Sequence, residues 1–272
     1  MKRMCACSAA MVALLGAVTV EAQLELYYTN NFDTPVGPEW SQADRDVTPW
    51  GQRMFLGQFG AESVTLTLSD LPPHSTLLLT FDLFIIGSWD GNYVGSGAGP
   101  DIWQVWADEG AAFTTTFNTH TFAAQYQAYP DIYPGGQHPS NTGATEVNTL
   151  GYSCIGSCTN AVYHFELALG HANGTLTLGF GAANLEALSN ESWGLDNLQL
   201  SLEGSPCDFN RDAYVDLFDY EGLEICIKGP NVPPNYYCSI DSDIDDDGDV
   251  DLADFQRFQN GFCGPDYWPV CL

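Results

Sequence analysis

Two acidic segments near the C-terminus combine the residue types and the spacing of calcium-binding loops. One covers residues 208–219 and the other covers residues 243–254. Both place oxygen-bearing side chains at loop positions 1, 3, 5, 9 and 12, with valine at position 8. Calcium takes about six to eight oxygen ligands, and a loop of this length supplies them at this spacing. The spacing therefore predicts two calcium sites.

The predicted ligands fall at equivalent positions of the two loops. Those of the first loop are Asp208, Asn210, Asp212, Asp216 and Asp219, with the backbone carbonyl of Tyr214. Those of the second loop are Asp243, Asp245, Asp247, Asp251 and Asp254, with the backbone carbonyl of Asp249. Position 6 needs a residue that accepts a positive φ, as Gly248 does, but Ala213 stands there in the first loop. We therefore expect the first loop to bind calcium more weakly.

A short amphipathic helix is predicted to follow each loop. After the first loop, apolar side chains recur at helical spacing at Leu217, Tyr220, Leu223 and Ile227. After the second loop, they recur at Leu252, Phe255, Phe258 and Phe262. Gly-Pro pairs at 229–230 and 264–265 end both helices. Neither unit is large enough to bury its apolar face alone, so we expect the two units to pack together.

This pair of loop–helix units resembles a type I dockerin. The resemblance covers about 60 residues and implies a calcium module that attaches an exported protein to a cohesin-like or cell-surface protein. Dockerins often accompany plant-polysaccharide enzymes. Cohesin-binding members often carry Ser-Thr at loop positions 10 and 11, where this chain has Leu217-Phe218 and Leu252-Ala253. Because the acidic loops repel one another without metal, we expect this module to fold only with calcium.

The composition divides the chain into three predicted parts. Residues 1–22 read as an export signal, because two basic residues precede an apolar stretch and a small-residue cleavage site at Ala22. That stretch is too short to span a membrane. Residues 23–203 hold two arginines, no lysine and 19 acidic residues, and residues 204–272 contain the predicted calcium loops. Because of the export signal, we expect a secreted or cell-surface protein.

Export makes disulfides the expected state of the cysteines. Cys154 and Cys158 lie four residues apart in a loop-like stretch, and we expect them to form a local disulfide. Five more cysteines occupy the last 66 residues, at positions 207, 226, 238, 263 and 271. Five is an odd number, so one of these thiols should be free or should pair outside the module. The sequence does not specify the other pairings.

Residues 23–203 are predicted to form a two-sheet β-sandwich. Period-two alternation or continuous apolar character marks six short strands, at residues 63–68, 77–86, 102–107, 162–169, 175–180 and 195–202. Turn residues separate these strands, and no long segment shows a helical period. The stretch from about 125 to 151 is polar and contains Pro130, Pro134 and Pro139. It predicts a long loop, and loops of that length are often functional.

Short motifs in the predicted sandwich carry a family resemblance. Asn-Phe-Asp at 31–33 and Trp-Gly-Leu-Asp-Asn-Leu at 193–198 are similar to the first and last strands of galactose-binding-like jelly rolls, a group that includes many carbohydrate-binding modules. Bacterial exported proteins of unassigned function share Ser-Trp-Asp-Gly-Asn at 88–92 and Gly-Pro-Asp at 99–101. The resemblance implies a jelly roll with a structural calcium near the chain ends, held by Asp33 and Asp196.

Physical chemistry gives a separate reason to expect metal in the sandwich. Asp90, Asp101 and Asp196 lie beside apolar strands, and only two arginines are available to pair with them. A buried unpaired carboxylate is costly, and a hard cation neutralises it. For Asp90 and Asp101, solvated turn positions are an equal alternative. A third calcium site, located in the sandwich, is therefore possible in addition to the two predicted in the C-terminal module.

The charge of the chain excludes several partners. With 35 acidic against seven basic residues, the formal net charge is −28. Such a chain does not displace counterions from nucleic acid, and it is not attracted to anionic membranes. Serine-hydrolase, zinc-protease and P-loop motifs are absent, so no catalytic residue is assigned. A glycoside hydrolase needs only two carboxylates, and four glutamates leave one possible, namely Glu62, Glu146, Glu166 and Glu186.

Three functions remain open on the sequence. The favoured one is a noncatalytic exported calcium-binding protein, whose sandwich serves adhesion or assembly and whose C-terminal module binds a protein. The second is a glycan-binding module that takes a polysaccharide. Its candidate stacking residues are Trp89, Trp103, Trp106, Tyr126, Tyr129 and Tyr133. The third is a polysaccharide hydrolase. An exposed group of aromatic side chains would favour the second function, and two carboxyl groups facing each other across a cleft would favour the third.

Overall fold

The computed structural model describes most of the chain after the predicted export signal. It covers residues 25–261, except 73, 96–97, 109, 122–124, 155–156, 205–206, 211–214, 235–237, 239–241 and 246. Asp212 and Tyr214 of the first predicted calcium loop lie outside the described residues, as do Phe262, Cys263 and Cys271.

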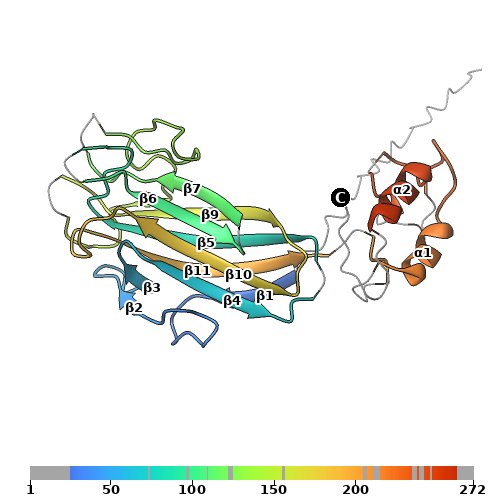
Figure 1. The fold of residues 1–272 in the computed structure, drawn as a ribbon, viewed down its shortest axis with the longest axis horizontal. Coiled ribbons are helices and arrows are strands. Elements are labelled where there is room, and N and C mark those ends of the chain that lie inside the picture. The colour runs from blue at the N-terminus through green and yellow to red at the C-terminus, as the bar shows by residue number, and fades with distance from the viewer. Residues whose placement is uncertain are drawn as a thin grey trace, which may run out of the picture.

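Two β-sheets face each other across an apolar core (Figure 1). In the larger sheet the strand order is β2-β3-β11-β5-β9-β8, and β1 also pairs with β11. These strands are β1 (Glu25–Asn30), β2 (Arg45–Val47), β3 (Met54–Phe59), β5 (Thr76–Gly87), β8 (Glu146–Val147), β9 (Ala161–Gly170) and β11 (Glu191–Glu203). In the smaller sheet the order is β4-β10-β6-β7, formed by β4 (Ser63–Ser69), β6 (Ile102–Ala107), β7 (Gly110–Thr116) and β10 (Thr175–Ala183). The predicted two-sheet sandwich is confirmed.

All six strands predicted from the sequence are present, because each buries alternate or successive apolar side chains. In β4 the burial alternates along the strand, and Val64, Leu66 and Leu68 face the core. β5 is buried along its last five residues, as its continuous apolar run predicts. Aromatic rings fill the space between the sheets, with Phe81 stacked on Phe165 at a centroid distance of 4.9 Å. This core fixes the ends of the strands, from which the functional loops extend.

The pairing of β5 with β11 defines two ends of the sandwich. These strands run antiparallel, and Gly87 lies opposite Glu191 at one end. Thr76 lies opposite Glu203 at the other end. The chain leaves β11 at Glu203 toward the C-terminal module, which lies beyond that end in Figure 1. The loops that follow β5 and β7 gather at the Gly87 end.

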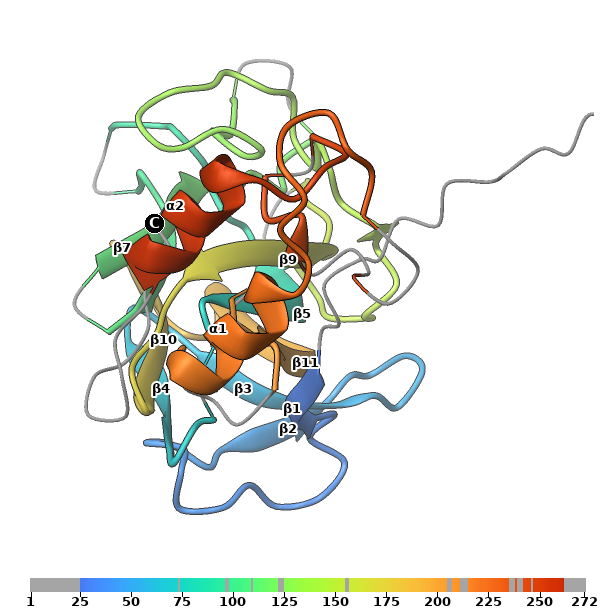
Figure 2. The same cartoon turned by 90° about the vertical axis from the view of Figure 1, so that its right-hand side faces the viewer.

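The described residues of the C-terminal module include two short helices, α1 (Leu217–Glu224) and α2 (Leu252–Gly261). They lie close together in Figure 2 and enclose a small core of their own. Tyr220 of α1 contacts Phe255 and Phe258 of α2, with ring centroids 5.8 and 6.1 Å apart. The predicted packing of the two units is therefore confirmed.

The predicted apolar faces of the helices need a correction at their first residues. Leu217 and Leu252 are 67% and 74% exposed, although both were expected to face the core. Each is the first residue of its helix, next to the acidic loop, and it lies outside the contact that Tyr220 and Phe258 make. The core forms from the second turn of each helix instead.

Two disulfides are present among the described residues. Cys154 pairs with Cys158, as the sequence predicts, and the bond closes the loop before β9. Cys226 pairs with Cys238 and joins the end of α1 to the segment before the second predicted calcium loop. Cys207 is buried in the core of the module. Within the described ranges, no helix has the length and apolar character that crossing a membrane requires.

Candidate functional site

Two long loops meet at the Gly87 end of the sandwich. The 88–101 loop connects β5 to β6, and the 117–145 loop connects β7 to β8. The backbone N–H of Asn92 donates to the carbonyl of Tyr126 at 2.8 Å. Gly91 permits this close approach, because it has φ +67° and a Cβ there would overlap the same carbonyl oxygen. The glycine of the Ser-Trp-Asp-Gly-Asn motif thus joins the two loops.

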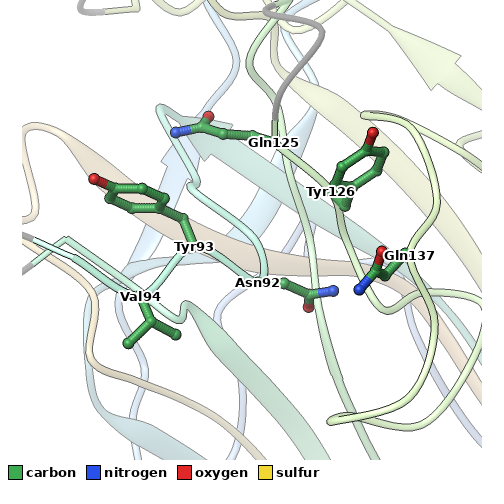
Figure 3. A pocket seen from close by; sticks show the side chains of 6 residues that line it. All are labelled: Asn92, Tyr93, Val94, Gln125, Tyr126 and Gln137. Carbon is green, nitrogen blue, oxygen red and sulfur yellow. The ribbon is translucent and has the colours of Figure 1, made fainter.

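A small surface pocket lies where these loops meet. Its volume is about 270 Å³, and its lining residues are Asn92, Tyr93, Val94, Gln125, Tyr126 and Gln137. Figure 3 shows the Tyr93 and Tyr126 rings on different sides of it, with the Gln125 side chain extending toward the Tyr93 side and the Gln137 side chain beside Tyr126. The two tyrosines are 41% and 42% exposed. The pocket therefore has two aromatic rings and three amide side chains in its lining.

Hydrogen bonds hold the wall of the pocket in place. The Asn92 amide donates to the carbonyl of Gly136 at 3.0 Å and also accepts from the Thr116 hydroxyl. The Gln125 amide donates to Asp90 Oδ1 at 3.1 Å. These bonds fix Asn92 and Gln125 as structural parts of the wall. Tyr93, Tyr126 and Gln137 remain to contact a ligand.

Three carboxylates converge beneath the pocket. Asp90, Asp101 and Glu191 each contribute an oxygen atom, and these atoms lie within 4.8 Å of one another. Asp90 follows the end of β5, Asp101 precedes β6, and Glu191 begins β11. The two sequence motifs meet here, because the N–H of Asp90 donates to the Asp101 carboxylate and the N–H of Asp101 donates to the carbonyl of Gly91 at 3.1 Å.

Burial dominates the electrostatics of this cluster. Asp101 and Glu191 are fully buried, and Asp90 is 8% exposed. Burial raises the pKa of Asp101, and the neighbouring Glu191 carboxylate raises that pKa further. Burial also raises the pKa of Glu191. The cluster therefore favours a positively charged partner, in the form of shared protons or of a bound cation.

Asp33 and Asp196 lie apart from this cluster. The Asp196 carboxylate lies 3.7 Å from the Arg53 guanidinium and accepts from the N–H of Asn197 at 2.8 Å. Burial raises the pKa of Asp196 to about 6, although Arg53 opposes the shift. Asp33 accepts from the amide of Asn31 at 2.6 Å. Arg53 thus supplies Asp196 with one positive charge, and the calcium site at Asp33 and Asp196 stays a prediction.

The candidate stacking aromatics divide between core and surface. Trp89 and Trp103 are fully buried, so their proposed stacking role is wrong. Tyr129 packs against Phe117 and Tyr163, with ring centroids 5.3 and 5.0 Å away. The other candidates, Trp106 and Tyr133, are partly buried and do not line the pocket. Of the six candidates, Tyr126 is the one at the pocket.

In the C-terminal module, the structure brings predicted ligands of the second loop together. Asp243, Asp245 and Asp254 form one group of converging carboxylates, and Asp249 and Asp251 form another with the same Asp254. Asp249 contributes its side-chain carboxylate to this group, whereas the prediction named its backbone carbonyl. Asp254 is fully buried and accepts from the N–H of Asp251 at 2.7 Å. Gly248 has φ +95°, as position 6 requires. Asp247 is exposed and accepts from the N–H of Asp249 at 3.2 Å.

The described part of the first loop shows the same arrangement at its end. Asp219 is fully buried and accepts from the N–H groups of Asn210 and Asp216 at 3.1 and 2.8 Å. Asp216 in turn caps α1. Asp208 is partly buried. The position-12 aspartate of each loop thus folds back over its own loop.

No family model matches this chain, and neither does any curated protein. Several solved structures share a distant likeness. A carbohydrate-binding module described for specific mannan recognition, TmCBM27, has a TM-score of 0.36 at 13% identity, covering 67% of this chain and 99% of its own. A non-crystalline-cellulose-specific module, CBM28, has a TM-score of 0.32 at 15% identity, covering 64% and 91%. CBM27-1 of Caldicellulosiruptor saccharolyticus, solved with mannohexaose, has a TM-score of 0.30 at 9% identity, covering 59% and 88%. Similarities of this size do not decide a function.

Sequence reasoning missed Glu191 and most of the pocket. Glu191 reaches the cluster because it pairs with Gly87, three residues before Asp90. That register is a property of the sheet and has no local signal in the sequence. Tyr93 follows directly after the Ser-Trp-Asp-Gly-Asn motif, so its position beside Asp90 was the available signal.

Proposed function

We propose that the sandwich binds a glycan in the pocket between the 88–101 and 117–145 loops. The observation that carries this proposal is the pair of half-exposed tyrosines, Tyr93 and Tyr126, with the Gln137 amide beside them. Apolar faces of sugar rings stack on aromatic side chains, while amides bond to hydroxyl groups. A noncatalytic exported glycan-binding protein fits these residues better than the adhesion or assembly function favoured on the sequence.

The same pocket supports binding rather than hydrolysis. None of its six lining residues is acidic, whereas glycoside hydrolysis needs two carboxyl groups at the bond to be cleaved. Asp101 and Glu191 are fully buried beneath it and do not reach a bound sugar. Glu146, one of the glutamates considered for catalysis, is paired with Arg53 at 3.0 Å.

For the C-terminal module we infer calcium binding and a protein partner. The converging carboxylates of the second loop and the folded-back Asp219 support the metal. The large apolar side chains at loop positions 10 and 11 are strongly exposed, at 67% for Leu217 and Phe218 and 74% for Leu252. Exposed apolar side chains at equivalent places on two helices favour a protein surface as the partner, of the cohesin-like or cell-surface kind.

Affinity electrophoresis of the full chain tests the glycan proposal. The gels contain soluble mannan, xylan, mixed-linkage β-glucan or pectin, and retardation in one of them measures binding. We expect Tyr93→Ala and Tyr126→Ala each to weaken that binding about tenfold or more, which is about 1.4 kcal/mol. Tyr93→Phe and Tyr126→Phe keep the ring and should retain most of the affinity.

Trp50→Ala is the matched control for this experiment. Trp50 is 58% exposed and does not line the pocket, so its loss should leave retardation unchanged. Retardation that depends on Trp50 and not on the two tyrosines would place the glycan elsewhere. Absence of retardation in all four polysaccharides would argue against glycan binding.

A further inference from the structure

Two fully buried carboxylates beneath the pocket have oxygen atoms without a hydrogen-bond partner. They are Asp101 Oδ1 and Glu191 Oε1. The second oxygen of each is bonded, to the N–H of Asp90 and to the N–H of Glu186. Both side chains belong to the cluster that Asp90 completes. Buried polar atoms are almost always bonded, so these two oxygens call for a partner, which is either a proton or a cation.

The sandwich offers little positive charge to this cluster. Arg45 donates to the carbonyl of Phe32, and Arg53 pairs with Glu146, Asp82 and Asp196. Residues 23–203 contain no lysine. His120 lies 3.0 Å from Asp90 Oδ1, which provides at most one positive charge for three carboxylates. A cluster of this kind is stable when a multivalent cation compensates it.

We propose that Asp90, Asp101 and Glu191 bind one calcium ion. Carboxylate oxygens are ligands that a hard divalent cation prefers, and no cysteine lies among the three. Gln125 adds a neutral oxygen beside them, because its amide bonds to Asp90 and its Oε1 is also buried without a partner. This site is separate from the two loops of the C-terminal module.

The position of this ion links it to the pocket, a consequence that rests on the proposed glycan function. The N–H of Tyr93 donates to the carbonyl of Asp90 at 3.3 Å. Gln125, from the opposite loop, donates to the Asp90 carboxylate. An ion held by Asp90 therefore fixes both loops that carry the tyrosines, and glycan binding becomes calcium-dependent.

Equilibrium dialysis of the full chain against radioactive calcium tests the site directly. We expect Asp101→Asn and Glu191→Gln each to weaken one bound ion at least tenfold, and the double variant to bind one ion fewer than the unaltered chain. Asp46→Asn is the matched control, since it removes a partly buried carboxylate of the sandwich that bonds to Gln58 and Tyr152 and lies outside the cluster. An unchanged ion count in the double variant would overturn the site, as would binding of zinc but not calcium.

A thermal scan separates loss of the site from loss of the fold. Tryptophan fluorescence reports mainly on the sandwich, which holds six of the seven tryptophans. Without calcium, the double variant should melt at or above the temperature of the unaltered chain, because carboxylate repulsion is gone. With calcium, the melting temperature of the unaltered sandwich should rise, while that of the double variant should not. A calcium-induced rise of the same size in both proteins would contradict the proposal.

Affinity electrophoresis of the double variant in calcium then tests the link to the pocket. We expect the glycan affinity to fall about tenfold or more. An unchanged affinity would overturn the link, while the ion count still decides the site. Absence of glycan binding in the unaltered chain would instead count against the proposed function and leave the dialysis result standing.

Discussion

Arg53 is the residue on which the charge balance of the larger sheet depends. Its guanidinium contacts Glu146 at 3.0 Å, approaches Asp82 and Asp196 at 3.9 and 3.7 Å, and lies 4.5 Å above the Phe84 ring. We expect Arg53→Met to lower the free energy of unfolding by about 2 kcal/mol at pH 8, because Asp196 is left buried and unpaired. Urea unfolding followed by tryptophan fluorescence measures this loss.

The cost of losing Arg53 should depend on pH in a defined direction. The folded-state pKa of Asp196 is raised to about 6, above its unfolded value, and removal of Arg53 raises it further. Below about pH 5 the carboxyl group is protonated with or without Arg53, so the cost shrinks there and grows as the pH rises through 6. In an Asp196→Asn background this pH dependence should disappear. A cost that is equal at pH 5 and pH 8 would show that Asp196 is not the group concerned.

At the scale of single residues, the sequence predicts part of the site. Asp90, Asp101 and Asp196 could be proposed as metal ligands, because residues 23–203 have only two arginines to neutralise buried aspartates. The structure brings the first two together and places Asp196 beside Arg53 instead. Glu191 could not be proposed, because it joins Asp90 and Asp101 only through the register of β11 against β5. Trp89 and Trp103 could be proposed from the sequence as stacking residues, but the structure buries both. A tryptophan beside an apolar strand has the same local pattern whether its ring faces the core or the solvent.

At the scale of elements, close contact between strands fixes the shape of the larger sheet. Gly194 in β11 lies against β3, where a Cβ would overlap the Phe55 ring and lie 2.8 Å from the carbonyl oxygen of Leu56. We expect Gly194→Ala to cost about 2 kcal/mol, which lowers the melting temperature by several degrees. Gly170→Ala is the control, since a Cβ at the end of β9 meets nothing within 4 Å. Equal melting temperatures for the two variants would contradict this close packing.

The elements predicted from the sequence are those whose pattern is local. β4 alternates strictly, and β5 is continuously apolar, so both could be assigned from the sequence alone. β3 and β7 were not assigned, because Gly57 interrupts the first and small residues fill the second. Their strand character comes from pairing with β11 and β6, which is tertiary information. The two helices could be predicted from the loop spacing, but the exposure of Leu217 could not.

At the scale of the whole molecule, the two proposed binding regions lie at opposite ends of the sandwich. The pocket follows the Gly87 end of β5, and the chain leaves for the C-terminal module beside the Thr76 end. The 12 residues of β5 are joined by eleven steps of about 3.3 Å, which separate these ends by about 36 Å. A partner protein on the exposed residues of α1 and α2 would therefore not cover the pocket. We infer that one chain can hold a glycan and a protein partner at the same time.

Calcium removal should unfold one end of the molecule and leave the other end folded. Residues 204–272 carry 15 acidic and three basic residues. Asp219 and Asp254 are fully buried, and Asp254 converges with four other carboxylates of its loop. Without a cation, the repulsion between these carboxylates exceeds the stabilisation from the small core around Leu223 and Phe258, whereas the sandwich has a large core of its own.

The distribution of basic residues makes trypsin a selective probe of this difference in stability. Arg211, Lys228 and Arg257 lie in the module. In the sandwich, Arg45 begins β2 and Arg53 directly precedes β3. With calcium, we expect slow cleavage throughout. With chelator, we expect rapid cleavage at the three module positions and a persistent fragment that contains the sandwich.

The control is an Asp243→Asn, Asp254→Asn double variant digested in the presence of calcium. It should reproduce the chelator pattern, which excludes an effect of the chelator on trypsin itself. A module that resists trypsin equally with and without calcium would show that it folds without the ion.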